Sequence, residues 1–442
     1  GQVLAALFVA SVFVPVFYAN RVATVYQLLE QRIGTGAKQA ASAAFMLGRV
    51  LASGARLYIA AIAAALVMFG DLEPLHLCLG VALLTLISIA YSLAGGLTSI
   101  IWTDVVQTVV FVGAAVAALV VLWHRIPLPW HDLVAVLEHP SPGAPSKLGL
   151  FQFGLDPSAA YTLPTAVFGF ALLNAAAYAT DQDLAQRMLT CRSAIKGSWS
   201  MIGAIAITIP VTLLFLFIGL LLFVIYQRAD VMGAAAPTHA ADDGREVFLT
   251  FIMREMPGGL AGIMLAGLFA VGFTSLLSAL NAMASAFVND FYRRLRPAAD
   301  DAHYLKVGRL AVVGWGVVLG GFAIACVFWQ RAQGQALIDF ALGVMTFAYS
   351  GLLAVFCTAV FTRRGTSASA VAALVAGAVA VTLLQNAVWP VWAPDAWCAV
   401  HLAFPWHMLI ASLVAFGVCC LGRREQPRSQ VRPQTMTLVT DD

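Results

Sequence analysis

Apolar segments of 18 residues or more recur along almost the whole chain, and their length leaves few folds open. A helix of that length crosses a hydrocarbon core of about 30 Å. Hydrophobic residues make up 61% of the 442 residues and charged residues only 11%, far from the composition of soluble proteins. We therefore expect an all-α, polytopic membrane protein.

The hydropathy pattern predicts eleven spanning helices. Their expected ranges are 1–19, 41–70, 76–94, 99–124, 162–181, 196–227, 257–290, 307–330, 336–362, 367–388 and 403–422. Long irregular segments are expected at 125–160, which is rich in proline, and at 228–246. Two shorter segments, 23–33 and 247–256, are amphipathic and are expected to lie at the membrane interface.

Lys and Arg residues indicate the orientation of the helices, because cytoplasmic loops carry an excess of them. If the chain starts outside, the loops expected in the cytoplasm hold sixteen Lys and Arg residues and the opposite loops hold six. This predicts a cytoplasmic C-terminus. The polar segment 423–442 is expected to be a disordered cytoplasmic tail.

A stripe of polar side chains runs along one face of the helix expected at 257–290. Thr274, Ser278, Asn281 and Ser285 are spaced by four, three and four residues among apolar neighbours. Hydroxyls and amides need partners that hydrocarbon does not supply. The stripe is therefore expected to face other helices or a water-filled path, which indicates a protein that moves a solute across the membrane.

Other chemistries find little support in the sequence. The seven cysteines are scattered, with no CxxC pair, so neither a disulfide framework nor a zinc site is predicted. No basic patch interleaved with aromatics suggests nucleic-acid binding, and no nucleophile–base–acid set suggests an enzyme.

Arg49 and Arg56 share a face of the second helix at different depths. Each is either structural or functional, and Arg56 could pair with a substrate carboxylate or an acidic residue of another helix.

Five strings in the sequence resemble the sodium:solute symporter family, which includes sodium/glucose, sodium/proline and sodium/pantothenate cotransporters. They are TVYQLLEQRIG at 24–34, YSLAGGLTSIIWTDVVQ at 91–107, TDQDLAQR at 180–187, the segment 259–281 that contains Thr274-Ser275, and the segment from Tyr349 to Arg364. They occur in the family's order, which makes the resemblance specific.

The resemblance implies an inverted-repeat bundle of the leucine-transporter type. The helix at 1–19 then matches the second core helix, and the first core helix is absent from this sequence. Segment 1–362 would hold core helices 2 to 10, with two additional spanning helices at 363–422. In such folds a broken helix helps to bind ion and substrate, so any site in this chain is expected to be incomplete.

The resemblance also implies a sodium site made by the hydroxyls of Thr274 and Ser275 and the carbonyl of Val271. Na⁺ is a hard cation that takes about five oxygens, and neutral oxygens bind it weakly enough to release it. The alternative is that these hydroxyls only bond the carbonyl four residues earlier in their own helix.

Further polar residues are candidates for the transport path. Asp104 could attract Na⁺ leaving on the cytoplasmic side, or could only pair with a helix N-terminus, an effect of about 0.3–1 kcal/mol. For substrate binding the candidates are Asn174, Tyr178, Asp181, Gln182, Thr346 and Tyr349. Their alternative role is hydrogen bonding between helices, about 0.6 kcal/mol on average.

These observations predict a secondary active transporter of the plasma membrane. It would use Na⁺ as the coupling ion, without an organic cofactor, to take up a small polar solute by alternating access. Its partners would be the solute and the lipid bilayer, with no nucleic acid. A solute sensor on the same scaffold, or a proton-coupled carrier, is the alternative. The sequence does not identify the solute.

Overall fold

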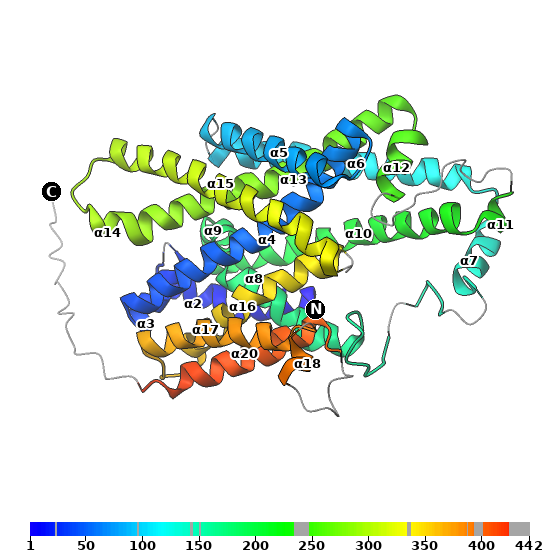
Figure 1. Ribbon diagram of the computed structural model, residues 1–442. Helices are drawn as coiled ribbons and strands as arrows, with labels where there is room; N and C mark the ends of the chain where they lie inside the picture. Colours follow the sequence, from blue (N-terminus) through cyan, green and yellow to red (C-terminus); the bar gives the residue numbers. More distant parts are fainter. Residues whose placement is uncertain are drawn as a thin grey trace, which may run out of the picture.

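The computed structural model describes residues 1–423, except residue 23 and segments 95–96, 142–144, 150–151, 234–246, 334–336, 387 and 393–400. The described residues form helices and connecting segments, without strands among them. Of the expected tail 423–442, only Arg423 is among the described residues. The all-α architecture expected from the apolar segments is confirmed (Figure 1).

Ten helical segments in the described part of the chain are long and apolar enough to span a membrane. They are Gln2–Ala19 (α1, η1 and α2), Thr35–Phe69 (α4), Pro74–Ala94 (α5), Leu97–Arg125 (α6), Ala194–Gln227 (α10), Gly258–Leu295 (α13, η4 and α14), Asp301–Gln333 (α15), Leu337–Phe361 (α16), Ser367–Leu384 (α17) and Phe404–Leu421 (α20). Each corresponds to one of the eleven predicted helices. Helices α4 and α15 begin six residues earlier than predicted, since 35–40 and 301–306 continue the helical backbone.

The remaining predicted helix, 162–181, is shorter than a full span. It consists of a π-helical turn, Thr165–Phe170 (η2), and Ala171–Thr180 (α8). The helix stops at Asp181, whose backbone is extended with φ −83° and ψ 116°. A separate helix, Gln182–Leu189 (α9), follows at once. This break places a carboxylate between two helix ends.

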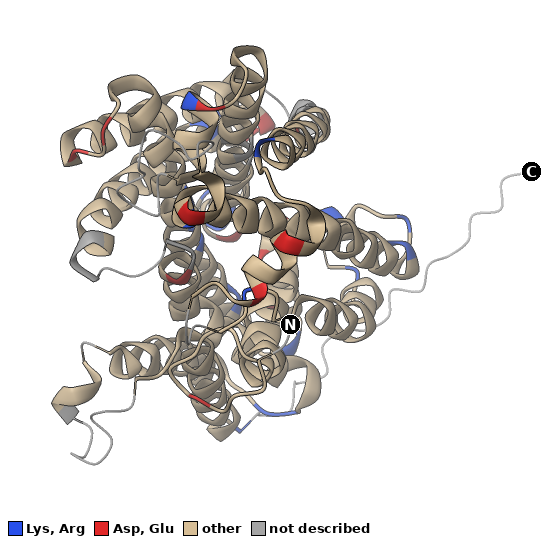
Figure 2. Cartoon of the chain, turned by 90° about the vertical axis from the view of Figure 1, so that its right-hand side faces the viewer, with Lys and Arg blue, Asp and Glu red and all other residues tan. Residues whose placement is uncertain are grey.

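Short helices cap the two ends of the bundle. Val25–Arg32 (α3) and Val247–Arg254 (α12) form where amphipathic segments were predicted. Trp130–Glu138 (α7) and Ala229–Met232 (α11) lie at the end of the molecule opposite to α3 (Figure 1). A further short helix is Trp389–Trp392 (α18). Figure 2, seen from the end that bears α7 and α11, shows only scattered charged residues among the uncharged ones, as expected of a protein surrounded by lipid.

Helix α4 runs through the middle of the bundle. In Figure 1 the helices α5, α6, α13 and α15 lie on one side of it and α16, α17 and α20 on the other. Helices α4 and α16 are the two most buried of the spanning helices described here. A Cβ atom on Gly48 would lie 2.5 Å from the Cβ of Ala348, so the α4 and α16 backbones approach closely. Small residues at such contacts are typical of helix packing in membranes.

Candidate functional site

The break between α8 and α9 orients the carboxylate of Asp181. Its Oδ1 accepts a hydrogen bond of 3.0 Å from the backbone N–H of Asp183, so Asp181 caps the N-terminus of α9. Its backbone carbonyl accepts from the N–H of Ala185 at 2.9 Å. The second carboxylate oxygen, Oδ2, is therefore turned toward the neighbouring helices.

Two side chains from other helices reach that oxygen. Arg49 of α4 donates from Nη1 to Asp181 Oδ2 at 2.7 Å, and the Tyr349 hydroxyl of α16 donates to the same oxygen at 2.7 Å. All three side chains are buried, and Arg49 is only 4% exposed. Arg49 also pairs through Nη2 with Asp183. A buried arginine is tolerated here because both sides of its guanidinium meet carboxylates.

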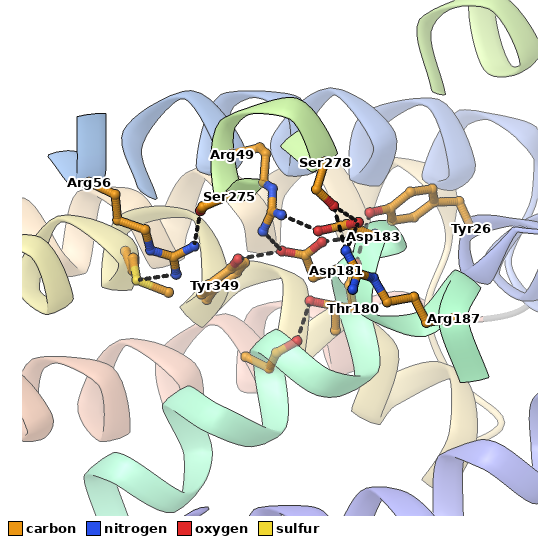
Figure 3. A network of polar contacts seen from close by, with 12 residues as sticks. Tyr26, Arg49, Arg56, Thr180, Asp181, Asp183, Arg187, Ser275, Ser278 and Tyr349 are labelled. Carbon is orange, nitrogen blue, oxygen red and sulfur yellow. Dashed lines mark hydrogen bonds and ion pairs between the residues drawn. The ribbon is translucent and has the colours of Figure 1, made fainter. Parts of the chain in front are cut away.

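A second branch of the network continues from Asp183 (Figure 3). Its carboxylate accepts from the hydroxyl of Ser278 on α13, and Arg187 donates from Nη2 to the same hydroxyl at 2.9 Å. Arg187 Nη1 lies 3.7 Å from Asp104 Oδ2 on α6. We call Arg49, Asp181, Asp183, Arg187, Ser278, Tyr349 and Asp104 the inner network. It joins α4, α6, α13 and α16 to the α8–α9 break, and its three carboxylates exceed its two arginines by one negative charge.

Helix α3 makes hydrogen bonds to the residues on both sides of the break. The carbonyl of Thr180 accepts a 2.8 Å hydrogen bond from the buried hydroxyl of Tyr26 on α3. In the other direction, the backbone N–H of Val25 donates to the side-chain oxygen of Gln182 at 3.0 Å. Helix α3 is thereby fastened to the break. These contacts explain how a helix interruption persists in an apolar bundle.

Arg56 lies two helical turns along α4 from Arg49, between α13 and α16 (Figure 3). Its Nη1 is 3.4 Å from the hydroxyl oxygen of Ser275, and its Nη2 is 3.9 Å from the sulfur of Met345. Its side chain is accessible, although the residues on either side of it, 52–55 and 57–58, are buried. Arg56 is therefore exposed at a place where α4 lies close to α13 and α16.

The structure places the predicted sodium ligands on α13. Ser275 is half-buried and faces Arg56. The side chains of Val271 and Thr274 lie outside the described residues, although their backbone is helical. Two members of the polar stripe face other helices as predicted: Ser278 contacts Asp183, and the Asn281 side-chain oxygen accepts from Ser92 of α5 at 3.3 Å. Ser285 is instead exposed and accepts a hydrogen bond from Asn289 of its own helical segment.

The predicted substrate residues do not all converge. Asp181 and Tyr349 meet in the inner network, and Gln182 holds α3. Asn174 donates to the carbonyl of Phe170 at 2.7 Å, and Thr346 donates to that of Gly343 at 2.6 Å, within their own helical segments. The half-buried Tyr178 lies on α8.

Sequence reasoning noted Arg49 without finding its partners. The partners were signalled only indirectly, by two aspartates in the string TDQD beside an arginine in an apolar run. Ser278 was recognised only as part of the polar stripe.

This chain belongs to the sodium:solute symporter family, whose family model matches residues 1–377. It is 26% identical to the sodium/sialic acid symporter SiaT of Proteus mirabilis over 385 residues, covering 86% of this chain and 74% of that protein. It is 25% identical to the sodium/sialic acid symporter NanT of Aliivibrio fischeri, covering 88% and 74%. The sodium/mannose cotransporter SLC5A10 of Bos taurus is 28% identical, with coverage of 86% and 65%.

A solved structure of a Na⁺-coupled sialic acid symporter, in a substrate-bound outward-open state, has the same fold. The two superpose with a TM-score of 0.74 at 23% identity, covering 95% of this chain and 82% of the other. The inverted-repeat fold expected from the sequence is thereby confirmed. The family and its members define this protein as a secondary active transporter coupled to Na⁺.

Proposed function

We propose that this transporter takes up a small polar solute with Na⁺ by alternating access, and that α13 supplies the sodium ligands. The ligands are the hydroxyls of Thr274 and Ser275 and the carbonyl of Val271. The observation that carries this proposal is the inward position of Ser275, within reach of Arg56 of α4 and one turn from Ser278. A hydroxyl in that place faces an ion path rather than lipid.

The experiment that tests this proposal removes the hydroxyl pair. The full chain with Thr274→Ala and Ser275→Ala should lose Na⁺-driven solute uptake into liposomes, because two of about five oxygens are deleted. A matched control exists on α10, where the exposed Thr208 and Thr212 hydroxyls bond the carbonyls four residues earlier, at 2.9 Å each. Their double alanine variant should transport normally. Unchanged uptake in the α13 variant would refute the sodium site.

The solute is proposed to contact α8 and α16. Asn174, Tyr178, Gln182 and Thr346 remain candidate contacts, and Asp181 with Tyr349 would border the cavity. Relatives named for sialic acid, mannose, vitamins and iodide support a small polar or charged solute. Sodium-dependent thermal stabilisation against a solute panel would identify it.

The inner network is proposed to close the cytoplasmic side. It ties the α8–α9 break to α4, α6, α13 and α16, so these contacts must separate before ion and solute leave toward the cytoplasm. Asp104, which lies 3.7 Å from Arg187, is then placed to attract Na⁺ on its exit.

The excess of Lys and Arg in alternate loops supports a plasma-membrane orientation with the C-terminus in the cytoplasm. A proton-coupled carrier on this scaffold would be driven by a pH gradient without Na⁺. A solute sensor would bind the solute without moving it. Uptake measured with each gradient imposed separately distinguishes these alternatives.

A further inference from the structure

A cavity of about 220 Å³ lies between the N-terminal parts of α16 and α20. We call it the α16–α20 pocket. Its wall also includes the C-terminal end of α17 and the residues just before η2. On α16 the lining residues share one face of the helix: Phe340, Gly343, Val344 and Phe347. Met345 and Tyr349 lie on the opposite face, toward α4 and the α8–α9 break, so the pocket is separate from the proposed transport path.

His407 of α20 lies in the wall of this pocket and is buried, with only 4% of its surface exposed. Neither ring nitrogen makes a hydrogen bond of normal geometry to a described residue, although the Leu402 backbone is near enough to interact with the ring. A neutral imidazole offers one donor and one acceptor, and buried polar groups without partners cost free energy. The imidazole is therefore available to a ligand in the pocket.

The charge of the wall indicates the class of that ligand. Besides His407, Asp339 is the only acidic or basic residue among the described residues that line the pocket. The Tyr161 hydroxyl donates to Asp339 Oδ1, and Oδ2 accepts no hydrogen bond from a described residue. A carboxylate without a basic neighbour in the same wall favours a cation and disfavours an anion. The side-chain carbonyls of Gln385 and Asn386 add neutral acceptors.

Aromatic rings form much of the apolar part of the wall. They belong to Trp329, Phe340, Phe347 and Phe404. Trp329 and Phe340 contact each other edge to face, with their ring centroids 5.3 Å apart. The faces of aromatic rings attract organic cations, and the rings also cover hydrocarbon groups. An ammonium ion attached to a short apolar group therefore matches both parts of the wall.

Contacts around the pocket hold its walls together. The N–H of Ala403 donates to the carbonyl of Pro157 at 2.9 Å, which joins the start of α20 to the segment before η2. A Cβ atom on Gly169 would lie 2.3 Å from the Cβ of Pro405, so η2 and α20 approach closely. The pocket is thus bounded by packed elements, as is typical of preformed small-molecule sites.

We propose that the α16–α20 pocket binds a small organic ammonium ion. The ammonium group would pair with Asp339 and donate an N–H to the acceptor nitrogen of His407, and its apolar group would lie among the aromatic rings. The pocket uses none of the proposed sodium ligands of α13, so this site goes beyond the proposed function. A bound ammonium would connect α16 to α20, away from the transported solute.

The first test compares three probes that share a phenyl group and a short chain but differ in charge: phenylethylammonium, 2-phenylethanol and phenylacetate. Binding to the full chain in detergent is measured by calorimetry near neutral pH, in potassium buffer without Na⁺. Phenylethylammonium should bind about tenfold or more tightly than 2-phenylethanol, because charge-assisted hydrogen bonds are the stronger ones. Phenylacetate should not bind. Equal binding of the ammonium and the alcohol, or no binding of the ammonium, would overturn the proposal.

The second test removes the charge of the wall. Asp339→Asn should weaken phenylethylammonium binding by about tenfold or more. Tyr161→Phe is the matched control, because it removes the hydroxyl that contacts the same carboxylate and keeps the charge, so it should bind at least as tightly as wild type. If Tyr161→Phe weakens binding as much as Asp339→Asn, the contact between the two residues matters rather than the charge, and the proposal is wrong.

The third test concerns the imidazole. His407→Phe keeps a buried ring but lacks both nitrogens, and should weaken phenylethylammonium binding by about tenfold. Unchanged affinity would show that His407 takes no part and would contradict the proposed site. The Thr274→Ala and Ser275→Ala variant should bind the ammonium like wild type, which separates this site from the sodium site. If a pocket variant does not elute as a folded monodisperse protein, the comparison of the three probes on wild type decides.

Discussion

At the level of single residues, the two arginines of α4 illustrate how a charge is accommodated in an apolar bundle. Arg49 pairs through its two terminal nitrogens with Asp181 and Asp183, and Tyr349 adds a hydrogen bond to the Asp181 carboxylate. A buried ion pair is held in place mainly because removal of one partner leaves the other charge buried and unpaired. Arg49 is therefore a residue on which the packing of three helices depends.

The variant Arg49→Met tests this dependence. It should lower the free energy of unfolding by about 3–5 kcal/mol, because the Asp181 and Asp183 carboxylates lose their common cation. Thermal unfolding in detergent measures the effect. Asp230→Asn is the control, for which little change is expected because the Asp230 side chain is 63% exposed. The double variant Arg49→Met, Asp181→Asn should recover part of the loss. Additive losses would contradict direct coupling.

At the level of elements, the interruption between α8 and α9 is maintained by contacts from other helices. The Tyr26 hydroxyl satisfies the carbonyl of Thr180, and Asp181 caps α9 through the N–H of Asp183. Without these partners the buried backbone groups would favour a continuous helix. Helix α3 thus has a structural role in keeping the break open.

Tyr26→Phe should test that role. The substitution keeps the ring but leaves the Thr180 carbonyl without its donor, which should cost about 1–3 kcal/mol of stability. Tyr178→Phe is the matched control, since the half-buried Tyr178 has no hydrogen bond to a residue that the structure describes. Both are compared by thermal unfolding in detergent. An equal effect of the two variants would mean that the Tyr26 contact does not support the break.

At the level of the whole molecule, contacts at both ends connect the segment that contains α8 to α16. At one end, the Tyr349 hydroxyl of α16 donates a hydrogen bond to Asp181 at the C-terminus of α8. At the opposite end, the Tyr161 hydroxyl, just before η2, donates to the carboxylate of Asp339 on α16. Burial, followed by this hydrogen bond, raises the pKa of Tyr161 above its ordinary value of 10. The hydroxyl therefore remains a hydrogen-bond donor throughout the physiological pH range.

Weakening the inner network should increase local opening of the structure around α9 and leave the rest of the molecule unchanged. In Asp183→Asn the amides of α9, residues 182–189, should exchange hydrogen for deuterium about tenfold faster, since charged hydrogen bonds to Arg49 and Ser278 weaken. Amides of α20 serve as the internal reference and should not change. Asp230→Asn at the exposed helix α11 is the control variant. Faster exchange throughout the chain would indicate general destabilisation rather than local opening around α9.

Much of this protein could be predicted because the informative patterns are local. A run of 18 apolar residues determines a spanning helix whatever surrounds it, and the strings at 24–34, 91–107 and 180–187 identify the family on short segments. The inward direction of Ser278 also followed from spacing along one helix. The end of the helix at Asp181 was also predicted, to within one residue. The helix α9 that follows at once, and the contacts of Tyr26 and Arg49 with the break, were not predicted, since these residues are distant in the sequence.

The amino-acid sequence alone determined that the chain crosses the membrane many times, which family it resembles and where hydroxyls lie along α13. Only the tertiary structure decided that Arg49 meets Asp181, 132 residues away, while Arg56 on the same face meets no described carboxylate. The reason is physical: hydrophobicity and helix period act between neighbours in the chain, whereas the pairing of charges depends on which helices pack together.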